Sequence, residues 1–222
     1  MSLNIDFTEK RVIITAFFCI AFLIANLLTV KIINLGIWGL EVPAGVLIYP
    51  LVYILTNVIT EVYGEDTARR TLILAVLTNL LFVAMTTLIL FLPSPANYPG
   101  DASLEFVFTQ TPRILISSYL SFLIGNLANA RITSIVNREG NLAETKSGKN
   151  TLRIKNLGAI AIGELIDNII FIGLSFIGVY SNYEIFIMII SHWVLSLIWI
   201  VIAQPFTEKT VNWASKDETK TP

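Results

Sequence analysis

The amino-acid sequence predicts an all-α membrane protein with six transmembrane helices and both termini in the cytoplasm. Composition is the first reason: 55% of the 222 residues are hydrophobic, the mean hydropathy is +0.72, and only 14% are charged. A typical soluble domain has about 25% charged residues. Six segments are also close to the length of about 20 mostly apolar residues that a membrane span requires. Finally, lysines and arginines concentrate in alternate connections between these segments.

The first helix is expected over residues 12–33, directly after Lys10 and Arg11. Its apolar run is longer than the hydrophobic region of a typical signal peptide, and no small-residue cleavage site follows it. We therefore expect this segment to be retained as a transmembrane helix. The sequence LGIWGLEVP (35–43) is then expected to form a turn, and a second helix to cover 44–61.

The third and fourth helices follow from the two breaks that flank them. EVYGEDTARR (61–70) is a short charged turn in which Gly64 is placed like a helix C-cap, so the third helix is expected over 71–92. PSPANYPG (93–100) contains three prolines and cannot continue a helix. The fourth helix is expected over 113–136.

The polar segment NREGNLAETKSGKN (137–150) is expected to be a loop, with a fifth helix over 154–180 and a sixth over 184–206. We find no internal repeat and no connection long enough to fold alone. Residues 1–222 are therefore predicted to form a single six-helix transmembrane domain.

Basic residues set the orientation of these helices. They precede the first helix, join the second to the third, surround the loop after the fourth, and follow the sixth, whereas the other connections contain only Lys31 and Arg113. Because positively charged connections remain in the cytoplasm, we expect a multi-pass protein of the cytoplasmic (inner) membrane.

Several classes of function are excluded by composition. A net charge of −1 argues against nucleic acid as a partner. One cysteine, Cys19, and one histidine, His192, cannot form a cysteine-based or zinc site. No GxxxxGK[ST] loop for ATP and no complete catalytic set is present. We expect no enzyme activity, no catalytic residue, no cofactor and no metal.

The fifth helix carries charge where a lipid-facing helix would not. AIGELIDNIIF (161–171) places Glu164, Asp167, Asn168 and Phe171 on one helical face, close to the middle of the membrane. A carboxylate costs roughly 2.5–3.5 kcal/mol at that depth, and ionisable groups inside spans usually have a function. We therefore expect this face to line a binding site.

Other helices carry polar or aromatic residues at comparable depth. We expect these residues to line the same site: Asn26, Tyr53, Asn57, Glu61, Asn126, His192 and Trp199.

Alternative roles exist for several of them. Buried asparagines can hold helices together at about 1 kcal/mol or less each, and we favour this role for Asn26, Asn79 and Asn129 individually. A helix–helix hydrogen bond explains His192 equally well, and Glu61 is close enough to a helix end to be solvated.

The residue types indicate the kind of ligand. Ionised carboxylates accept hydrogen bonds, amides both donate and accept, and aromatic rings provide stacking surfaces. Together they favour a small, flat, nitrogen-rich molecule. The same carboxylates could instead carry protons or sodium ions, so an ion-conducting channel stays open as an alternative.

Two motifs resemble the VUT family of vitamin uptake transporters. They are VPAGVLIYPLVYILTNVITEVYGEDTARR (42–70) and GELIDNIIFIGLSFIG (163–178). The matching residues are Glu61, Val62, Tyr63, Gly64, Ala68 and Arg69 in the first motif, and Asp167, Asn168 and Phe171 in the second. The sequence departs from the family pattern at Asn57, where family members commonly have an aspartate.

The resemblance implies a transporter that imports a queuosine or archaeosine precursor, a deazaguanine base used in tRNA modification. It also implies a six-helix layout similar to the S components of energy-coupling factor transporters, but no dedicated ATPase module. The expected partners are then a purine-like substrate and the lipid bilayer. In such a site Glu164 or Asp167 would accept N–H donors of the base, and Asn168 or Asn126 would donate to its carbonyl.

One alternative is a vitamin-binding S component that needs an energy-coupling partner, and another is the proton or ion channel. The sequence leaves open which deazaguanine is preferred, what drives uptake, and whether the chain forms a homodimer.

Overall fold

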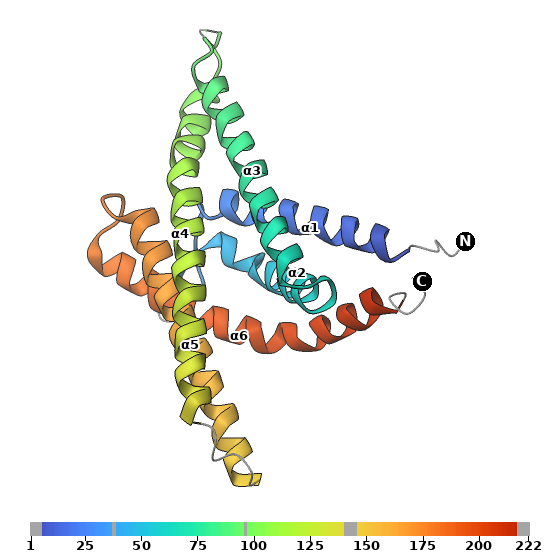
Figure 1. Cartoon of the computed structure of the whole chain (residues 1–222). Helices are drawn as coiled ribbons and strands as arrows, with labels where there is room; N and C mark the ends of the chain where they lie inside the picture. Colours follow the sequence, from blue (N-terminus) through green and yellow to red (C-terminus); the bar gives the residue numbers. More distant parts are fainter. Residues whose placement is uncertain (1–5, 37–38, 96, 140–145, 217–222) are drawn as a thin grey trace. The chain divides into compact units, whose positions relative to one another are not determined.

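The computed structural model describes residues 6–36, 39–95, 97–139 and 146–216, with the backbone alone for residues 126, 129–130, 133–139, 146–157 and 159. Its elements are α1 (Phe7–Leu28), β1 (Ile32–Asn34), β2 (Glu41–Pro43), the 3-10 helix η1 (Ala44–Leu47), α2 (Tyr49–Tyr63), α3 (Glu65–Leu90), α4 (Asp101–Glu139), α5 (Lys146–Phe176) and α6 (Asn182–Ser215) (Figure 1). The described part of the chain is thus mostly α-helical. Within it, α1, α3 and α6 are long and apolar enough to cross a membrane.

Contacts between residues divide the chain into two units. Unit 1 comprises Met1–Ile32, Pro43–Pro112 and Ile198–Pro222, and unit 2 comprises Ile33–Val42 and Arg113–Leu197. Both α4 and α6 therefore begin in one unit and end in the other. Whether the two units behave as one domain, as expected for residues 1–222, stays a prediction.

In unit 1, α1, α2 and α3 pack on one another. Their shared core contains Phe18, Val58, Ile59 and Ala75, and Ala214 near the end of α6 belongs to the same cluster. At Gly45 in η1, a Cβ atom would collide with the end of α1, so η1 packs there at closer range than a side chain permits. Because α1 and the C-terminal part of α6 share this core, the polar residues of α6 face those of α2.

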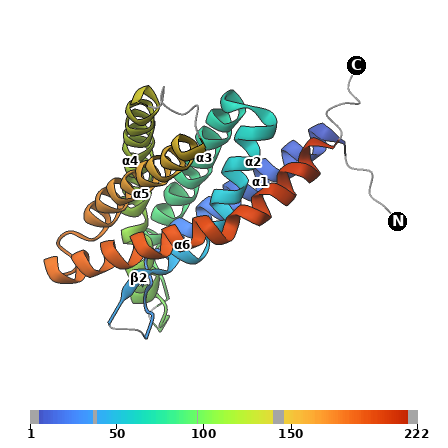
Figure 2. The same ribbon diagram turned by 90° about the horizontal axis from the view of Figure 1, so that it is seen from below.

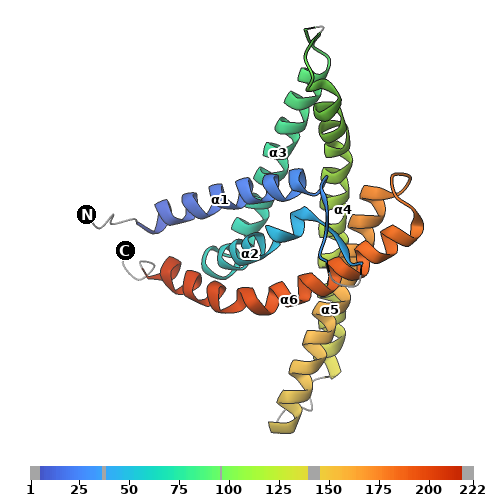
Figure 3. The same ribbon diagram turned by 180° about the vertical axis from the view of Figure 1, so that it is seen from behind.

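Lys10, near the beginning of α1, contacts Trp213 near the end of α6. Its Nζ donates a hydrogen bond of 3.0 Å to the backbone oxygen of Trp213 and lies 5.2 Å from the centre of the Trp213 ring. A cation at the C-terminal end of a helix is stabilised by the helix dipole. The beginning of α1 and the end of α6 consequently lie at the same end of unit 1 (Figure 1 and Figure 3).

Unit 2 contains most of α4, all of α5 and the first half of α6. Figure 2 shows α5 beside α4 and leading into α6. Arg113 fixes the C-terminal end of α5, because its Nε and Nη2 each donate a hydrogen bond of 2.6 Å, to the backbone oxygens of Leu174 and Ile177. Leu174 lies in the last turn of α5, where carbonyl groups lack a donor within the helix, and Ile177 directly follows the helix.

The segment between α1 and α2 differs from the expected turn and helix. Strands β1 and β2 pair with each other, and φ is 70° at both Gly36 and Gly39 between them. The α-helix expected from residue 44 begins only at Tyr49, after η1. Pro50 explains this start, since proline fits the first turn of a helix and cannot donate to the preceding turn.

Other boundaries also shift. The expected loop over 137–150 is helical at both ends, because α4 continues to Glu139 and α5 begins at Lys146. The start expected for α4 at residue 113 is wrong, since the helix begins at Asp101 and continues through Pro112. A proline removes only one backbone hydrogen bond, which a helix of 39 residues can lose. The predicted C-cap is confirmed: Gly64 ends α2 with φ of 85°.

Candidate functional site

The polar face of α5 carries three side chains that can accept hydrogen bonds, and they are buried or half-buried. We call Glu164, Asp167, Asn168 and Phe171 the α5 stripe. Asn168 is fully buried, and its Nδ2 donates a hydrogen bond of 2.7 Å to the backbone oxygen of Glu164. Its Oδ1 is buried without a partner among the described residues. An unpaired buried acceptor costs about 1–3 kcal/mol, so a fully buried Oδ1 next to two carboxylates favours a ligand or water at this point.

α4 lies directly against the acidic part of the stripe. A Cβ atom on Gly125 of α4 would lie 3.0 Å from Cβ of Asp167 and 3.2 Å from its Oδ1. Glycine at this position therefore allows the α4 backbone to approach the carboxylate.

Two adjacent residues of α6 contact both ends of AIGELIDNIIF (161–171). The indole nitrogen of Trp193 donates a hydrogen bond of 2.8 Å to the backbone oxygen of Ala161. The ring of His192 lies 6.1 Å, centre to centre, from the ring of Phe171. Since this α5 segment contains Glu164, Asp167 and Asn168, α6 crosses α5 at the level of the acceptors.

Two buried serines near this crossing also lack partners. The hydroxyls of Thr56, Ser117 and Thr207, as examples, donate to the backbone oxygen four residues earlier in their helix. By contrast, Oγ of Ser175 on α5 and Oγ of Ser191 on α6 have no partner among the described residues. With Asn168, unit 2 thus contains three buried polar atoms whose hydrogen bonds are not made within the described part of the chain.

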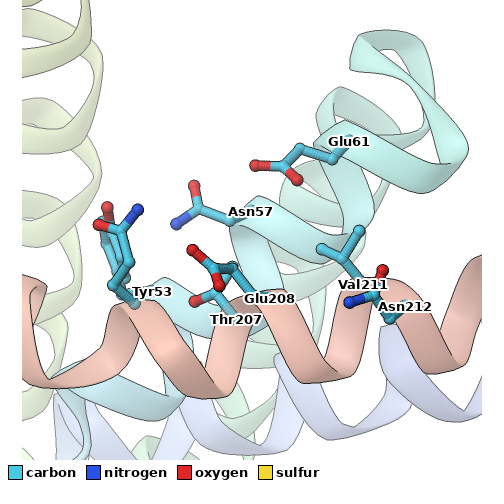
Figure 4. A pocket seen from close by; sticks show the side chains of 8 residues that line it. Tyr53, Asn57, Glu61, Thr207, Glu208, Val211 and Asn212 are labelled. Carbon is cyan, nitrogen blue, oxygen red and sulfur yellow. The ribbon is translucent and has the colours of Figure 1, made fainter.

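A second polar site lies in unit 1, in a pocket of about 400 Å³ between α2 and α6. We call it the α2–α6 pocket. From α2 it is lined by Tyr53, Asn57 and Glu61, one helical turn apart. From α6 it is lined by Gln204, Thr207, Glu208, Val211 and Asn212. Figure 4 shows Glu61 and Glu208 extending toward Asn57 from opposite helices.

The residue types of this pocket match those of a small-molecule site. Its volume of about 400 Å³ falls within the range of roughly 300–1,000 Å³ that is usual for ligand pockets. Two carboxylates accept hydrogen bonds, three carboxamides both donate and accept, and Tyr53 adds a ring that lies 6.4 Å from that of Tyr49. Within the described part of the chain, no group of three or more His, Cys, Asp or Glu side chains is arranged to hold a metal ion.

The expected site residues fall in both units. Tyr53, Asn57 and Glu61 come together in the α2–α6 pocket, as their spacing of four predicts. Asn26 and Trp199 belong to the same unit and do not line this pocket. Asn26 instead donates a hydrogen bond of 3.2 Å to Asn79 of α3, and Trp199 has a buried indole nitrogen without a partner among the described residues.

The remaining expected residues belong to unit 2. Glu164, Asp167, Asn168 and Phe171 share the α5 stripe, and His192 contacts Phe171 and lies 3.4 Å, through Nδ1, from Oγ of Ser196. Asn126 belongs to α4, but its side chain lies outside the described residues.

Sequence reasoning missed the α6 side of the pocket and the Trp193 contact. Ending the sixth helix at residue 206 excluded Glu208 and Asn212, although the structure continues α6 to Ser215. A signal was present: Gln204, Thr207, Glu208 and Val211 recur at spacings of three and four, as residues on one helical face do. Trp193 carried no such signal, because an indole in an apolar helix is as readily explained by packing.

Residues 43–209 match the family described as "Putative vitamin uptake transporter". A relative from Bacillus subtilis (strain 168), described as "Probable queuosine precursor transporter", is 27% identical over 196 residues, which cover 87% of this chain and 81% of the relative. No solved structure matches this chain.

Proposed function

This chain belongs to the putative vitamin uptake transporter family, and on that basis we propose that it imports a deazaguanine precursor of queuosine or archaeosine across the cytoplasmic membrane. Family membership makes it a membrane transporter and not an enzyme. The name of the Bacillus subtilis relative supports the substrate class, since that protein is described as a queuosine precursor transporter.

In this proposal all six α-helices cross the membrane and both termini are cytoplasmic. The apolar lengths of α1, α3 and α6 support three of these spans, and the family match over residues 43–209 includes the segments of the other three. The positions of lysine and arginine support the orientation. The layout then resembles that of S components, with no ATPase module of its own.

The observation that carries the proposed substrate is the buried Oδ1 of Asn168, which has no partner among the described residues and belongs to the same stripe as Glu164 and Asp167. Since Nδ2 of Asn168 already donates to the Glu164 backbone, we assign Oδ1 the role of an acceptor. Two carboxylates and one amide oxygen can accept from the ring N–H and exocyclic NH₂ groups of a guanine-like base. A sugar or a metal ion offers no comparable row of N–H donors.

The other groups in unit 2 complete the recognition of a flat base. Phe171 offers a ring face for stacking, and His192 limits the rotation of that ring from α6. Gly125 lets the α4 backbone lie close to the Asp167 carboxylate. Sites built from buried hydrogen-bond groups discriminate strongly, because an analogue that lacks one donor leaves an acceptor unpaired.

A thermal-shift screen of the purified protein against purines, deazaguanines and vitamins tests this assignment. A ligand that binds only the folded state raises the melting temperature, and the stabilisation grows with the logarithm of its concentration relative to Kd. We expect stabilisation by deazaguanines and no effect from adenine, whose edge presents fewer donors. Stabilisation by a vitamin alone would replace the proposed substrate with the vitamin class.

The family description itself favours one alternative, a vitamin-binding S component. Such a subunit needs an energy-coupling ATPase module, so uptake would be absent from cells that lack the module. We expect uptake without it. Currents through the purified protein in liposomes without any substrate would instead support the channel alternative.

A further inference from the structure

His192 is the chain's one histidine, and it is buried on α6 beside the α5 stripe. Its ring lies 6.1 Å, centre to centre, from that of Phe171. A charged imidazole is costly at so buried a position, whereas a neutral imidazole has one nitrogen that donates a hydrogen bond and one that accepts. The nitrogen that carries the hydrogen therefore determines what the ring offers to a ligand.

Ser196 distinguishes the two neutral forms of this ring. Its Oγ lies 3.4 Å from Nδ1 of His192, one turn earlier on α6, and its side chain is fully buried. The hydroxyls of Ser117 and Thr207 donate to the backbone oxygen four residues earlier, but the contact described for the Ser196 hydroxyl is with the imidazole. If Nδ1 carried the ring hydrogen, this buried hydroxyl would need a further acceptor for its own hydrogen. A serine that donates to Nδ1 satisfies both groups and places the ring hydrogen on Nε2.

A donor of this kind complements the acceptors of the α5 stripe. Glu164, Asp167 and Oδ1 of Asn168 accept hydrogen bonds, whereas a guanine-like base also presents a carbonyl oxygen, which needs a donor. The Asn168 amide already donates to the backbone oxygen of Glu164 at 2.7 Å, so a donor from another helix is the better source for this contact. Nε2 of His192 is the ring nitrogen farther from its own backbone, and the ring lies beside Phe171, whose face is proposed to stack on the base.

We propose that His192 is a specificity-determining residue of the α5 stripe: its Nε2–H donates a hydrogen bond to the carbonyl oxygen of the bound base, and Ser196 is the positioning residue that keeps the hydrogen on Nε2. The inference rests on the proposed function in taking the ligand to be a guanine-like base. It deepens that function by assigning the ring one tautomer and by predicting that a base with a poorer acceptor in place of its carbonyl oxygen binds less tightly.

The tautomer can be measured without any substrate, because a single histidine gives a single set of imidazole signals. The protein is prepared with isotope-labelled histidine and purified through an affinity tag that contains none. Couplings from the ring hydrogen on Cδ2 identify Nε2, and the nitrogen chemical shifts show which nitrogen is protonated. We expect the hydrogen on Nε2 in the parent. In Ser196→Ala the Nδ1 signal should move, because that nitrogen no longer accepts a hydrogen bond.

Ser117→Ala is the matched control for this measurement, since the Ser117 hydroxyl is also buried but donates to the backbone of its own helix. Its imidazole signals should match those of the parent. A hydrogen on Nδ1 or on both nitrogens of the parent would overturn the assigned tautomer. An Nδ1 signal that is unchanged in Ser196→Ala would overturn the positioning role of Ser196.

A second measurement tests the contact with the base. Thermal shift compares a deazaguanine with its thiocarbonyl analogue, which keeps every N–H donor and replaces the carbonyl oxygen with sulfur, a weaker acceptor. We expect the parent to bind the carbonyl form at least about threefold more tightly, as for the net value of one hydrogen bond. His192→Phe, which keeps a ring and removes the donor, should lose this preference.

Two further variants separate loss of the donor from loss of packing. The amide of His192→Gln reaches the position of Nε2 and should recover part of the preference, whereas the shorter amide of His192→Asn lies near that of Nδ1 and should not. Because both variants carry a carboxamide, their comparison holds even if His192→Phe lowers the melting temperature. A preference equal in the parent and in His192→Phe contradicts the donor role and leaves the deazaguanine class intact. An Nε2–H tautomer set by Ser196 without binding of either probe contradicts the base as its ligand, and with it the proposed substrate.

Discussion

Asn168 distinguishes the two roles that a buried amide can have in an apolar helix. Its Nδ2 bonds to the backbone of its own helix, which is a structural role, whereas its Oδ1 is left without a described partner. Asn26 and Asn79 differ, because their amides bond to each other across α1 and α3. Amide pairing therefore accounts for Asn26, and ligand binding is the better explanation of Asn168.

The variant Asn168→Leu tests this difference, because leucine has a similar size and no polar atoms. If Oδ1 accepts from the substrate, uptake should fall at least about tenfold, whereas losing the Nδ2 bond to the Glu164 backbone should cost only about 1 kcal/mol of stability, the usual net value of one intramolecular hydrogen bond. Substrate uptake and thermal unfolding are measured on the same preparation. A large loss of melting temperature with uptake preserved would assign Asn168 a purely structural role.

A side chain at Gly125 is predicted to disturb the substrate site, because the α4 backbone passes close to Asp167 at this position. A Cβ atom there would lie 3.0 Å from the Asp167 Cβ, so Gly125→Ala should push the helices apart and cost about 1–3 kcal/mol as overpacking usually does. We expect a raised KM for uptake and a lower melting temperature. Gly173→Ala on α5 is the control, since a Cβ there meets no atom within 4 Å, and equal behaviour of the two variants would contradict the close contact.

At the residue scale, the spacing of polar residues predicted which side chains of one helix share a site, but not which side chains of a second helix join them. Tyr53, Asn57 and Glu61 share a pocket as their spacing predicts, and the α5 stripe follows from the same rule. Gly125, Trp193 and Glu208 complete these sites from other helices. Which residue of a neighbouring helix faces a stripe depends on the crossing of the helices, and a single sequence does not contain that information.

At the scale of elements, the end of α5 depends on a residue of α4. Arg113 bonds to the backbone oxygens of Leu174 and Ile177 through two nitrogens of one planar group. The Arg113 guanidinium thus caps the C-terminal end of α5, directly before the turn in which Ile177 and Tyr180 form a β-bridge. The α5 stripe is held in register with α4 at this end by Arg113 and further along the helix by the contact at Gly125.

Replacement of Arg113 should therefore destabilise unit 2. Arg113→Gln is expected to lower the free energy of unfolding by about 1–3 kcal/mol, the range for hydrogen bonds to charged groups. Arg113→Lys should recover only part of it, because an ammonium cannot form the two-pronged contact. Denaturant unfolding in detergent measures the effect, and a Gln variant as stable as the parent would show that the cap contributes nothing.

Element boundaries were less predictable than element number. Gly64 marked the end of α2 correctly because its positive φ is unfavourable for other residues. Pro112 led to the wrong prediction of where α4 begins, because a proline usually marks a helix boundary but here lies inside the helix. The polar residues at 137–150 and after 206 also led to wrong predictions of helix ends. A helix can continue through a polar segment where it packs on neighbouring segments, as α6 does in the core that contains Ala214.

At the scale of the whole molecule, the proposed topology makes four loop positions diagnostic. Single cysteines in the Cys19→Ala background should react with a membrane-impermeant maleimide from outside the cell at Tyr98→Cys and Tyr183→Cys. Asp66→Cys and Lys209→Cys should react only after permeabilisation, because their connections are proposed to be cytoplasmic. All four positions are exposed, so differences in labelling report the side of the membrane. Labelling of Lys209→Cys in intact cells would contradict the six-span topology.

The most direct test of the central claim is uptake of a deazaguanine by the parent and by Asp167→Asn and Glu164→Gln in proteoliposomes. The carboxylates are proposed to accept from the base, so each variant should lose at least about tenfold in uptake, as for a lost charge-assisted hydrogen bond, while its yield and melting temperature stay near parental values. Glu184→Gln, an exposed carboxylate outside both sites, should transport normally. Parental rates for both α5 variants would contradict the assignment of the α5 stripe as the substrate site.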